Sequence, residues 1–581
     1  MNTSKYFLIL TLITCFGLSK LKAQGNIESV QIEAVGDKER TVTQSVKITS
    51  EPATYDSVIK LPPVIYQTIP VKADVSYTPE QIQPAKLNVL EPLDKLYPGY
   101  IKGGFGNYTS MFLDAYYGST RSRTNVWNAN VKHHSALGQI NDVGKTAFAD
   151  NLATFNYKHF YSKHTLELGA KYERNGFNYY GFPKNDTLID SVYKTNENIR
   201  QTYNFVQAHA GFGTNFSDSF KIKHFTELDY SFLSDRHGVN EHRVLVSNKL
   251  RKFIDSEYYG LSTVIDFNSY RQPIFTDFYN TSLINKTWNN AVVSLNPHIS
   301  SYGDKWKVKA GLILATDIGE ASSFHFYPDV EGRYVLFNGI FIPYAGITGG
   351  IQRNSFDKFR RENPFILSMQ EMRNTNQLYR LYGGIRGSIS SRFTFNTEVA
   401  AEKYSNFVMW GVDSSFSYQN RFVAVYDASM SYMRLLAEAT WLQSDKIRIA
   451  AKGEYYLYSP TDEEHAWQLP AFRQEVSAIY NLADKLIVRF DVFYWSKRKA
   501  YLWSFPSDDA LINIENAVLT NGKYIVDLKG FADINLGVEY RYNKRVSAFL
   551  NINNLTTVKY QRWLNHPYFG LNILGGATWR F

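Results

Sequence analysis

The sequence predicts an all-β protein: a large antiparallel transmembrane β-barrel of roughly 18–22 strands that follows a short irregular N-terminal segment. Three observations predict this class. From Tyr100 onward, apolar and polar residues alternate in runs of about 9–12 residues, the length that a tilted strand needs to cross a bilayer. Short polar turns and longer polar stretches separate these runs in alternation. Aromatic residues make up 16% of the chain, which suits a barrel with aromatic girdles at both membrane interfaces.

The chain begins like a secretory signal peptide. A basic residue precedes an apolar run at residues 6–18, which is too short to be a spanning helix. The small residue Ala23 precedes Gln24, so we expect cleavage between these two, with residues 1–23 removed. The only cysteine, Cys15, lies inside the apolar run, so the exported chain is expected to contain no disulfide.

Residues 24–98 differ from the rest because they show little clean alternation. Proline cannot donate to a β-ladder, so a long sheet is not expected in this stretch. We expect a periplasmic or lumen-threading segment here, before a barrel at residues 99–581. The prolines that favour this reading are Pro52, Pro62, Pro63, Pro70, Pro79, Pro84 and Pro92.

Alternation and turns define the barrel itself. In lipid an unpaired backbone N–H or C=O group costs several kcal/mol, so the strands are expected to close into a ring of even number with both ends in the periplasm. The short turns include Ser162-Lys163, Gly303-Asp304, Ser390-Ser391, Ser444-Asp445 and Asn543-Lys544. The longer connections are expected at residues 174–200, 233–242, 270–288, 354–376, 406–426, 459–468, 498–528 and 555–568.

Charged residues within the alternating runs are expected to face the lumen. Arg or Lys at the lipid midplane costs roughly 2–4 kcal/mol, which excludes the outer face for these positions. Two roles are open for them: they set the ion preference of the lumen, or they solvate it and pair across it. The candidates are Lys307, Lys309, Arg380, Arg386, Arg489 and Asp491.

The last twelve residues, GLNILGGATWRF, form a strand of period two. Its mainly apolar face ends in Trp579 and Phe581 at one rim. A secreted β-sandwich or propeller is the alternative fold. Its strands average nearer 5–6 residues, and it does not explain the aromatic end of the chain.

Residues 546–581 resemble the close of a TonB-dependent receptor barrel. Asn554-Leu555 matches the pair that commonly ends that family's penultimate strand, and Lys559-Tyr560 matches the pair that follows shortly after it. Trp579 and Phe581 resemble the C-terminal signal that the barrel-assembly machinery reads. Residues 96–110 are similar to the start of plug-lacking barrels of Bacteroidetes type. The resemblance implies a receptor-like barrel that lacks a full plug domain, because residues 24–98 contain no glycine-rich plug strands.

No spacing of residues indicates chemistry. The sequence has no G-x-S-x-G elbow, H-E-x-x-H pair or phosphate-binding loop, so no enzyme is expected. No set of histidines or carboxylates has metal-ligand spacing, so no cofactor is expected. The formal charge of +9 is dispersed, which argues against a nucleic-acid partner.

The leading hypothesis is an outer-membrane channel or transporter-like barrel for solutes. Its expected partners are outer-membrane lipid, the barrel-assembly machinery and other outer-membrane or periplasmic proteins. The alternative is an accessory barrel in an outer-membrane assembly or secretion complex, with residues 25–98 as a docking arm. The substrate is not encoded in any motif of the sequence.

Overall fold

The computed structural model describes residues 96–581 except residues 142, 183–198, 216–220, 256, 276–282, 320–321, 415–418 and 504–513. The expected cleavage site at Ala23 and Gln24 lies outside the described residues. So does nearly all of the 24–98 segment, and both assignments stay predictions.

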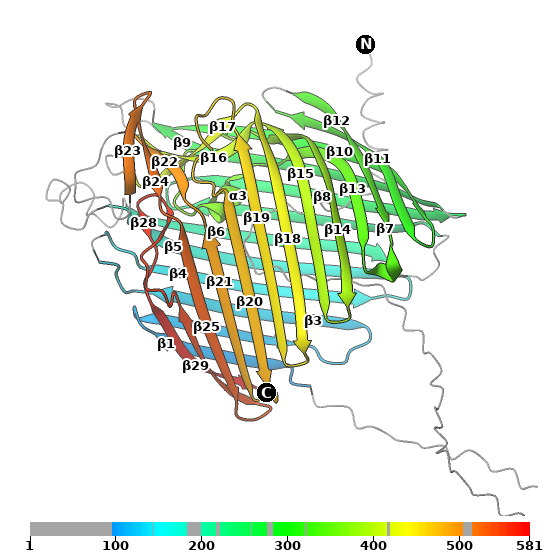
Figure 1. Ribbon diagram of the computed structural model, residues 1–581, viewed down its shortest axis with the longest axis horizontal. Helices are drawn as coiled ribbons and strands as arrows, with labels where there is room; N and C mark the ends of the chain where they lie inside the picture. The colour runs from blue at the N-terminus through cyan, green and yellow to red at the C-terminus, as the bar shows by residue number, and fades with distance from the viewer. Residues whose placement is uncertain are drawn as a thin grey trace, which may run out of the picture. The chain divides into compact units, whose positions relative to one another are not determined.

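The described residues form one closed antiparallel barrel of 22 strands (Figure 1). Each barrel strand pairs with the next along the chain, and the ring closes because β1 pairs with β29. The pairings of β15 with β18, β21 with β25 and β26 with β29 pass over strands that lie outside the barrel. The even strand number at the top of the predicted range confirms the fold class.

The barrel strands are β1 (Gly99–Gly106), β2 (Ser110–Gly118), β3 (Asn125–Ala136), β4 (Phe148–Phe160), β5 (His164–Asn178), β6 (Arg200–Thr214), β7 (Lys223–Asp235), β8 (Asn240–Ile254), β9 (Glu257–Phe275), β10 (Leu283–Tyr302), β11 (Trp306–Ile318), β12 (Ser323–Tyr334), β13 (Ile342–Gln352), β14 (Thr375–Ser390), β15 (Phe393–Ser405), β18 (Met430–Ser444), β19 (Ile447–Ser459), β20 (Phe472–Leu482), β21 (Leu486–Trp495), β25 (Phe531–Arg541), β26 (Val546–Asn553) and β29 (Asn572–Arg580). The connections carry η2 (Phe337–Gly339), α3 (Phe356–Glu362), β16 (Phe407–Val412), β17 (Phe422–Asp427), β22 (Arg498–Leu502), β23 (Ile514–Thr520), β24 (Lys523–Leu528), β27 (Gln561–Trp563) and β28 (His566–Pro567).

Successive residues of each strand face opposite sides of the barrel wall. On β18, Leu435 and Trp441 are 40% and 43% exposed on the outer face. Arg434 and Glu438 occupy the opposite face, where both take part in ion pairs. Large exposed apolar side chains recur in this way around the whole ring, as expected for a wall that faces lipid.

The two ends of the barrel chain meet at one aromatic rim. The backbone N–H of Phe581 donates to the carbonyl of Gly99 at 3.0 Å. The ring of Phe581 lies 6.0 Å from Tyr117 and 5.0 Å from Trp579, centroid to centroid. The last strand is therefore built into the wall. That Trp579 and Phe581 carry the assembly signal stays a prediction.

The expected long connection at residues 270–288 is wrong, because β9 and β10 run for 19 and 20 residues through most of it. Tyr270 pairs with Trp288 across these strands. The extension is stabilised by tertiary contact: Gln272 is buried and accepts the backbone N–H of Gln370 at 2.8 Å. A polar local pattern could not reveal this contact.

The expected long connection at residues 233–242 is also wrong, because only four residues separate β7 from β8. One oxygen of Asp235 accepts the backbone N–H groups of His237 and Val239, at 2.9 and 2.8 Å. Gly238 has a φ of 92°, which a residue with a side chain rarely adopts. The polar residues of this stretch therefore form a tight turn.

Among the described residues, no helix combines the length and apolar character needed to span a membrane.

Substituting Leu435→Arg tests the assignment of the two faces. The charge would lie on the outer face of β18, so we expect the free energy of unfolding in lipid vesicles to fall by about 2–4 kcal/mol. The neighbouring substitution Leu436→Arg is the matched control, since Leu436 faces inward opposite Glu398, and should lose less than half as much. Equal losses in urea titrations of the two variants would contradict the assignment.

Candidate functional site

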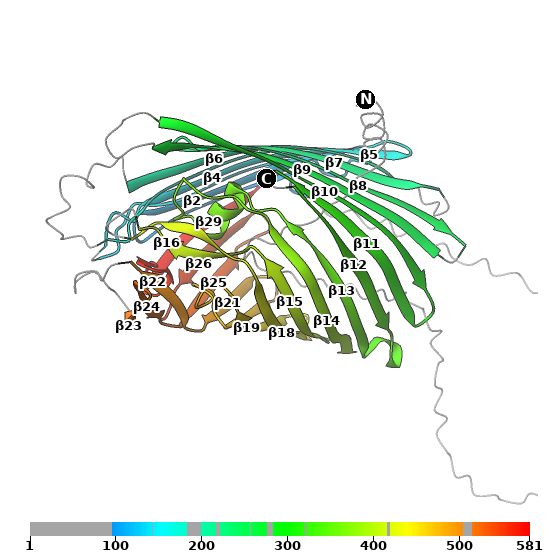
Figure 2. The same cartoon turned by 90° about the horizontal axis from the view of Figure 1, so that it is seen from above.

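The connections at one end of the barrel fold together and form a loop cap (Figures 1 and 2). These connections include the helix α3, the β16–β17 hairpin and the three-stranded sheet of β22, β24 and β23. The loop cap is defined here as residues 353–374, 406–414, 419–429, 460–471, 496–503, 514–530 and 554–571.

The loop cap has an apolar core that it shares with the barrel wall. Phe356, Phe359 and Ile366 of the cap are fully buried. They belong to one cluster with Tyr203 and Tyr270, which come from wall strands β6 and β9. The other buried members are Phe205, Leu233, Val239, Trp410, Val412, Phe422, Ala500, Leu502, Val526, Leu528, Trp563 and Leu564. Burial of this many large side chains stabilises the cap against the wall.

A wall carboxylate caps the N-terminus of α3. The two oxygens of Glu241 on β8 accept the backbone N–H groups of Phe356 and Asp357, at 2.8 and 2.9 Å. The hydroxyl of Ser355 accepts the N–H of Lys358 at 3.1 Å. A negative charge at this position also interacts favourably with the helix dipole. The helix is thus held by a residue more than a hundred positions away in sequence.

Arginines at the other end of α3 form ion pairs with the helix and the wall. Arg361 lies 3.0 Å from Asp357 and 3.1 Å from Glu173 on β5. Arg360 is buried and lies 2.6 Å from Asp357. Burial by itself would raise the pKa of Asp357, but Arg360 and Arg361 hold this pKa below its usual value. Asp357 therefore stays charged and both arginines stay compensated.

Tyrosines of the wall side reach across to the backbone of the cap. The hydroxyl of Tyr179 donates to the carbonyl of Ile366 at 2.8 Å, and that of Tyr203 to the carbonyl of Pro364 at 3.1 Å. Tyr270 donates to the carbonyl of Ser368 at 2.6 Å. These bonds join β6, β9 and the residue that follows β5 to the connection between β13 and β14, which lies far around the ring. The cap therefore crosses the lumen.

A neutral histidine lies in the middle of the cap. The ring of His566 stacks on Phe365 at 3.8 Å between centroids, and its Nδ1 lies 2.9 Å from the carbonyl oxygen of Leu564. Burial lowers the pKa of His566 to about 3. The ring is therefore uncharged at neutral pH and donates through Nδ1–H to that carbonyl.

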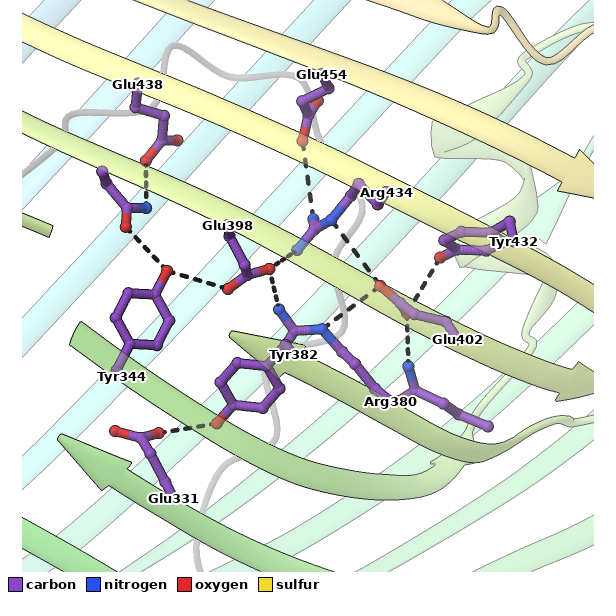
Figure 3. Close-up of polar contacts among 12 residues, drawn as sticks. Glu331, Tyr344, Arg380, Tyr382, Glu398, Glu402, Tyr432, Arg434, Glu438 and Glu454 are labelled. Atoms are coloured by element: carbon purple, nitrogen blue, oxygen red, sulfur yellow. Dashed lines mark hydrogen bonds and ion pairs between the residues drawn. The ribbon is translucent and has the colours of Figure 1, made fainter. Parts of the chain in front are cut away.

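The inner wall carries a network of ion pairs across β14, β15, β18 and β19 (Figure 3). Arg380 binds Glu398, and its Nε lies 3.4 Å from Glu402. Arg434 lies 2.6 Å from Glu398 and 3.8 Å from Glu454. Hydroxyl groups satisfy the remaining oxygens, as in the 2.6 Å bond from Tyr404 to Glu402. The charges compensate one another, so this stretch of wall is polar without being strongly basic or acidic.

The structure brings two of the six predicted lumen charges into ion pairs. Arg380 joins the network in Figure 3, and Lys309 binds Asp329 of β12. Lys307 and Arg386 lie over the rings of Tyr302 and Tyr344, at 4.9 and 5.3 Å from the centroids. Arg489 and Asp491 occupy alternate positions on β21, away from these groups in the sheet order. A role in ion preference stays a prediction for all six.

Sequence reasoning missed the residues that hold the cap. Glu173 and Glu241 lie on strands, as does Asp266, which lies 3.5 Å from Arg353 of the cap. All three resemble any other inward polar residue. Ser355, the residue that caps α3, is the one local feature of the cap that could have indicated a helix start. The described residues contain no cluster of three or more histidine, cysteine or acidic side chains that could hold a metal ion.

Substituting Glu241→Gln tests the anchoring of α3. It removes the charge at the helix N-terminus while keeping the size of the side chain, so we expect the cap to lose about 1–2 kcal/mol. Hydrogen exchange of the backbone at residues 353–374 should become roughly tenfold faster. Glu167→Gln is the control. It removes the charge of a partly exposed ion pair with Lys158 and should leave that exchange unchanged. Equal exchange in wild type and Glu241→Gln would contradict the anchoring.

Acid should loosen the cap through His566. Its pKa is about 6.5 in an unfolded chain and about 3 in the cap, so the folded state binds fewer protons between these values. The contribution of neutral His566 to the stability of the cap is complete above pH 6.5. It is lost as the pH falls, and the loss reaches about 2 kcal/mol at pH 5. We expect protease cleavage of the cap to accelerate from pH 7.5 to pH 5. His566→Phe keeps the stacking ring and should show a smaller acceleration, whereas an identical one would contradict the role of His566.

Comparison with known proteins gives the fold a context. No protein-family model and no curated protein matches the chain. A pyoverdine outer-membrane receptor of Pseudomonas aeruginosa PAO1 has a TM-score of 0.60 at 12% identity, over 84% of this chain and 79% of that one. An iron transporter of Neisseria meningitidis has a TM-score of 0.62 at 9% identity, over 84% of this chain and 82% of that one. A ferric-catecholate import receptor of Escherichia coli K12 has a TM-score of 0.59 at 10% identity, over the same shares of the two chains. At these identities the likeness is one of fold, and it confirms the expected resemblance to outer-membrane receptor barrels at that level.

Proposed function

We propose that this chain is a transporter-like barrel of the outer membrane, related to TonB-dependent receptors, that passes a soluble solute through its lumen. One observation carries the proposal: a closed 22-strand barrel has an outward apolar face and a polar inner wall, and a cap of its own connections crosses one end. A barrel of this size has a lumen that its wall side chains do not fill. The similar structures are named as receptors and transporters, which supports transport over an enzymatic role.

The finer assignments belong to this proposal. Residues 1–23 are a signal peptide, residues 24–98 a periplasmic or lumen-threading segment, and residues 99–581 the barrel. The resemblance of residues 96–110 supports the plug-lacking Bacteroidetes type. Trp579 and Phe581 are the signal for the barrel-assembly machinery.

The loop cap is proposed to be the gate of this barrel. Gln352 pairs with Thr375, so the wall on both sides of the α3 connection is continuous without it. The α3 connection can therefore move while β13 and β14 keep their ladder of hydrogen bonds. The six lumen charges, among them Arg380 and Lys309, are proposed to line the route that the cap closes.

Replacing residues 356–372 by a short Gly-Ser linker tests the transport proposal. The wild-type protein should show little steady conductance in planar lipid bilayers, because the cap crosses the lumen. The linker variant should show steady openings of at least tenfold higher conductance. A Gly-Ser replacement of the turn at residues 337–340, on the wall between β12 and β13, is the control and should behave like wild type.

Silence of the linker variant, despite its folding, would contradict a transport route through the lumen. A protein that stays attached to the purified barrel in that case would favour the accessory role.

A further inference from the structure

Three arginines from separate parts of the chain surround one tryptophan. Their guanidinium carbons lie 5.1 Å (Arg473), 5.5 Å (Arg498) and 5.3 Å (Arg562) from the ring centroid of Trp495. We call Arg473, Arg498 and Arg562 the arginine triad. Guanidinium groups over an aromatic face are stabilised by the ring, but their mutual repulsion remains.

Two carboxylates share the lumen face with Arg473, Glu454 as its cross-strand partner and Glu475 two residues along β20, but neither forms an ion pair with the arginine triad. None of its three members forms an ion pair with a described residue, in contrast to the buried arginines elsewhere in the barrel. Arg360 pairs with Asp357, and Arg353 with Asp266. A buried charge without an ion pair is costly, so the burial of Arg498 beside two further arginines needs a physical reason.

Arg498 shows the effect of the excess positive charge in the arginine triad. It is 2% exposed, and its two terminal nitrogens donate to the carbonyls of Gln561 and Arg562. Burial, followed by the charges of Arg562 and Arg473, lowers the pKa of Arg498 to about 9. The Nε atoms of all three triad members are buried and have no hydrogen-bond partner. The neutral carbonyls position Arg498 without offsetting its charge.

The position of the triad fits solute entry. Arg473 pairs with Trp495 at the capped ends of β20 and β21. Phe490 and Tyr494 are exposed on the outer face of β21, so Trp495 and its partner Arg473 point to the lumen. Arg498 and Arg562 come from the loop cap. Arg473 and Arg562 are only partly buried, so each can still reach a ligand.

We propose that the arginine triad binds the carboxylate or phosphate group of a soluble anionic solute, against the ring of Trp495. Arginine nitrogens on Arg473 and Arg562 that lack a protein partner would bond to the anion, and Arg498 behind them would add its positive field. Membrane lipid is an unsuitable source, because the triad faces inward. The inference deepens the transport proposal and rests on it only for the passage of the bound solute.

Titration calorimetry of the full-length barrel in detergent tests this proposal with citrate and inorganic phosphate as probes. We expect citrate to bind at moderate salt, more tightly than phosphate because it offers more carboxylates. Arg562→Gln and Arg473→Gln should each weaken citrate binding at least tenfold, and the double variant should abolish it. Both side chains lack hydrogen bonds and ion pairs to described residues, so the variants should fold, which heat-modifiable migration in gels will check.

Arg373→Gln is the matched control. Arg373 is an exposed arginine of the cap that pairs with Glu371, and its loss should leave citrate binding unchanged. Absence of citrate binding to the folded wild type, or equal losses in all arginine variants, would overturn the inference. Conductance of the cap-linker variant is independent of these titrations, so failure of anion binding and failure of the transport proposal are distinguishable.

Discussion

Closure of the backbone ladder is the constraint on which the rest of the structure depends. Tyr100 to Gly106 pair with Leu574 to Arg580, and this seam leaves the sheet with no edge. In a bilayer an open edge would leave its N–H and C=O groups without partners, at several kcal/mol each. Closure also gives the wall two faces, so the residues of each strand alternate: one faces lipid and the next faces the lumen. The chain must therefore solvate or pair every charge on the inner face.

The inner face meets this demand in two ways. Across β14, β15 and β18, carboxylates and arginines alternate so that each charge has an opposite neighbour, as around Glu398 and Arg434. Toward the cap, wall carboxylates pair with groups that the connections bring in, as Glu241 does with the start of α3. Breaking one side of such a buried pair is more destabilising than the pair is stabilising. Pairing therefore specifies where the cap docks more than it adds to stability.

The sequence predicted the wall well and the cap poorly, for a physical reason. A strand of period two is a local pattern, so the barrel, its turns and inward charges such as Arg380 follow from residues close together in the chain. Docking of the cap is not local. Phe356 and Phe359 lie in a stretch whose local pattern is that of a polar connection, and the helix that carries them is capped by Glu241, 115 positions away from Phe356. The triad likewise joins one wall residue, Arg473, with residues from two connections that no spacing relates.

The same difference decides which part of the barrel can move. Every wall strand is held on both sides by a continuous backbone ladder, so opening the wall would break many hydrogen bonds at once. The cap is held instead by the apolar core that it shares with the wall and by side-chain hydrogen bonds, among them those of the hydroxyls of Tyr179, Tyr203 and Tyr270. Each neutral hydrogen bond contributes about 0.5–1.5 kcal/mol, and solvent can replace it. Arg562 belongs to the cap and Arg473 to β20, so an anion bound between them would stabilise the docked cap, because a ligand shifts such an equilibrium only through its differential affinity for the two states. Release of the cap would then follow departure of the anion from the arginine triad.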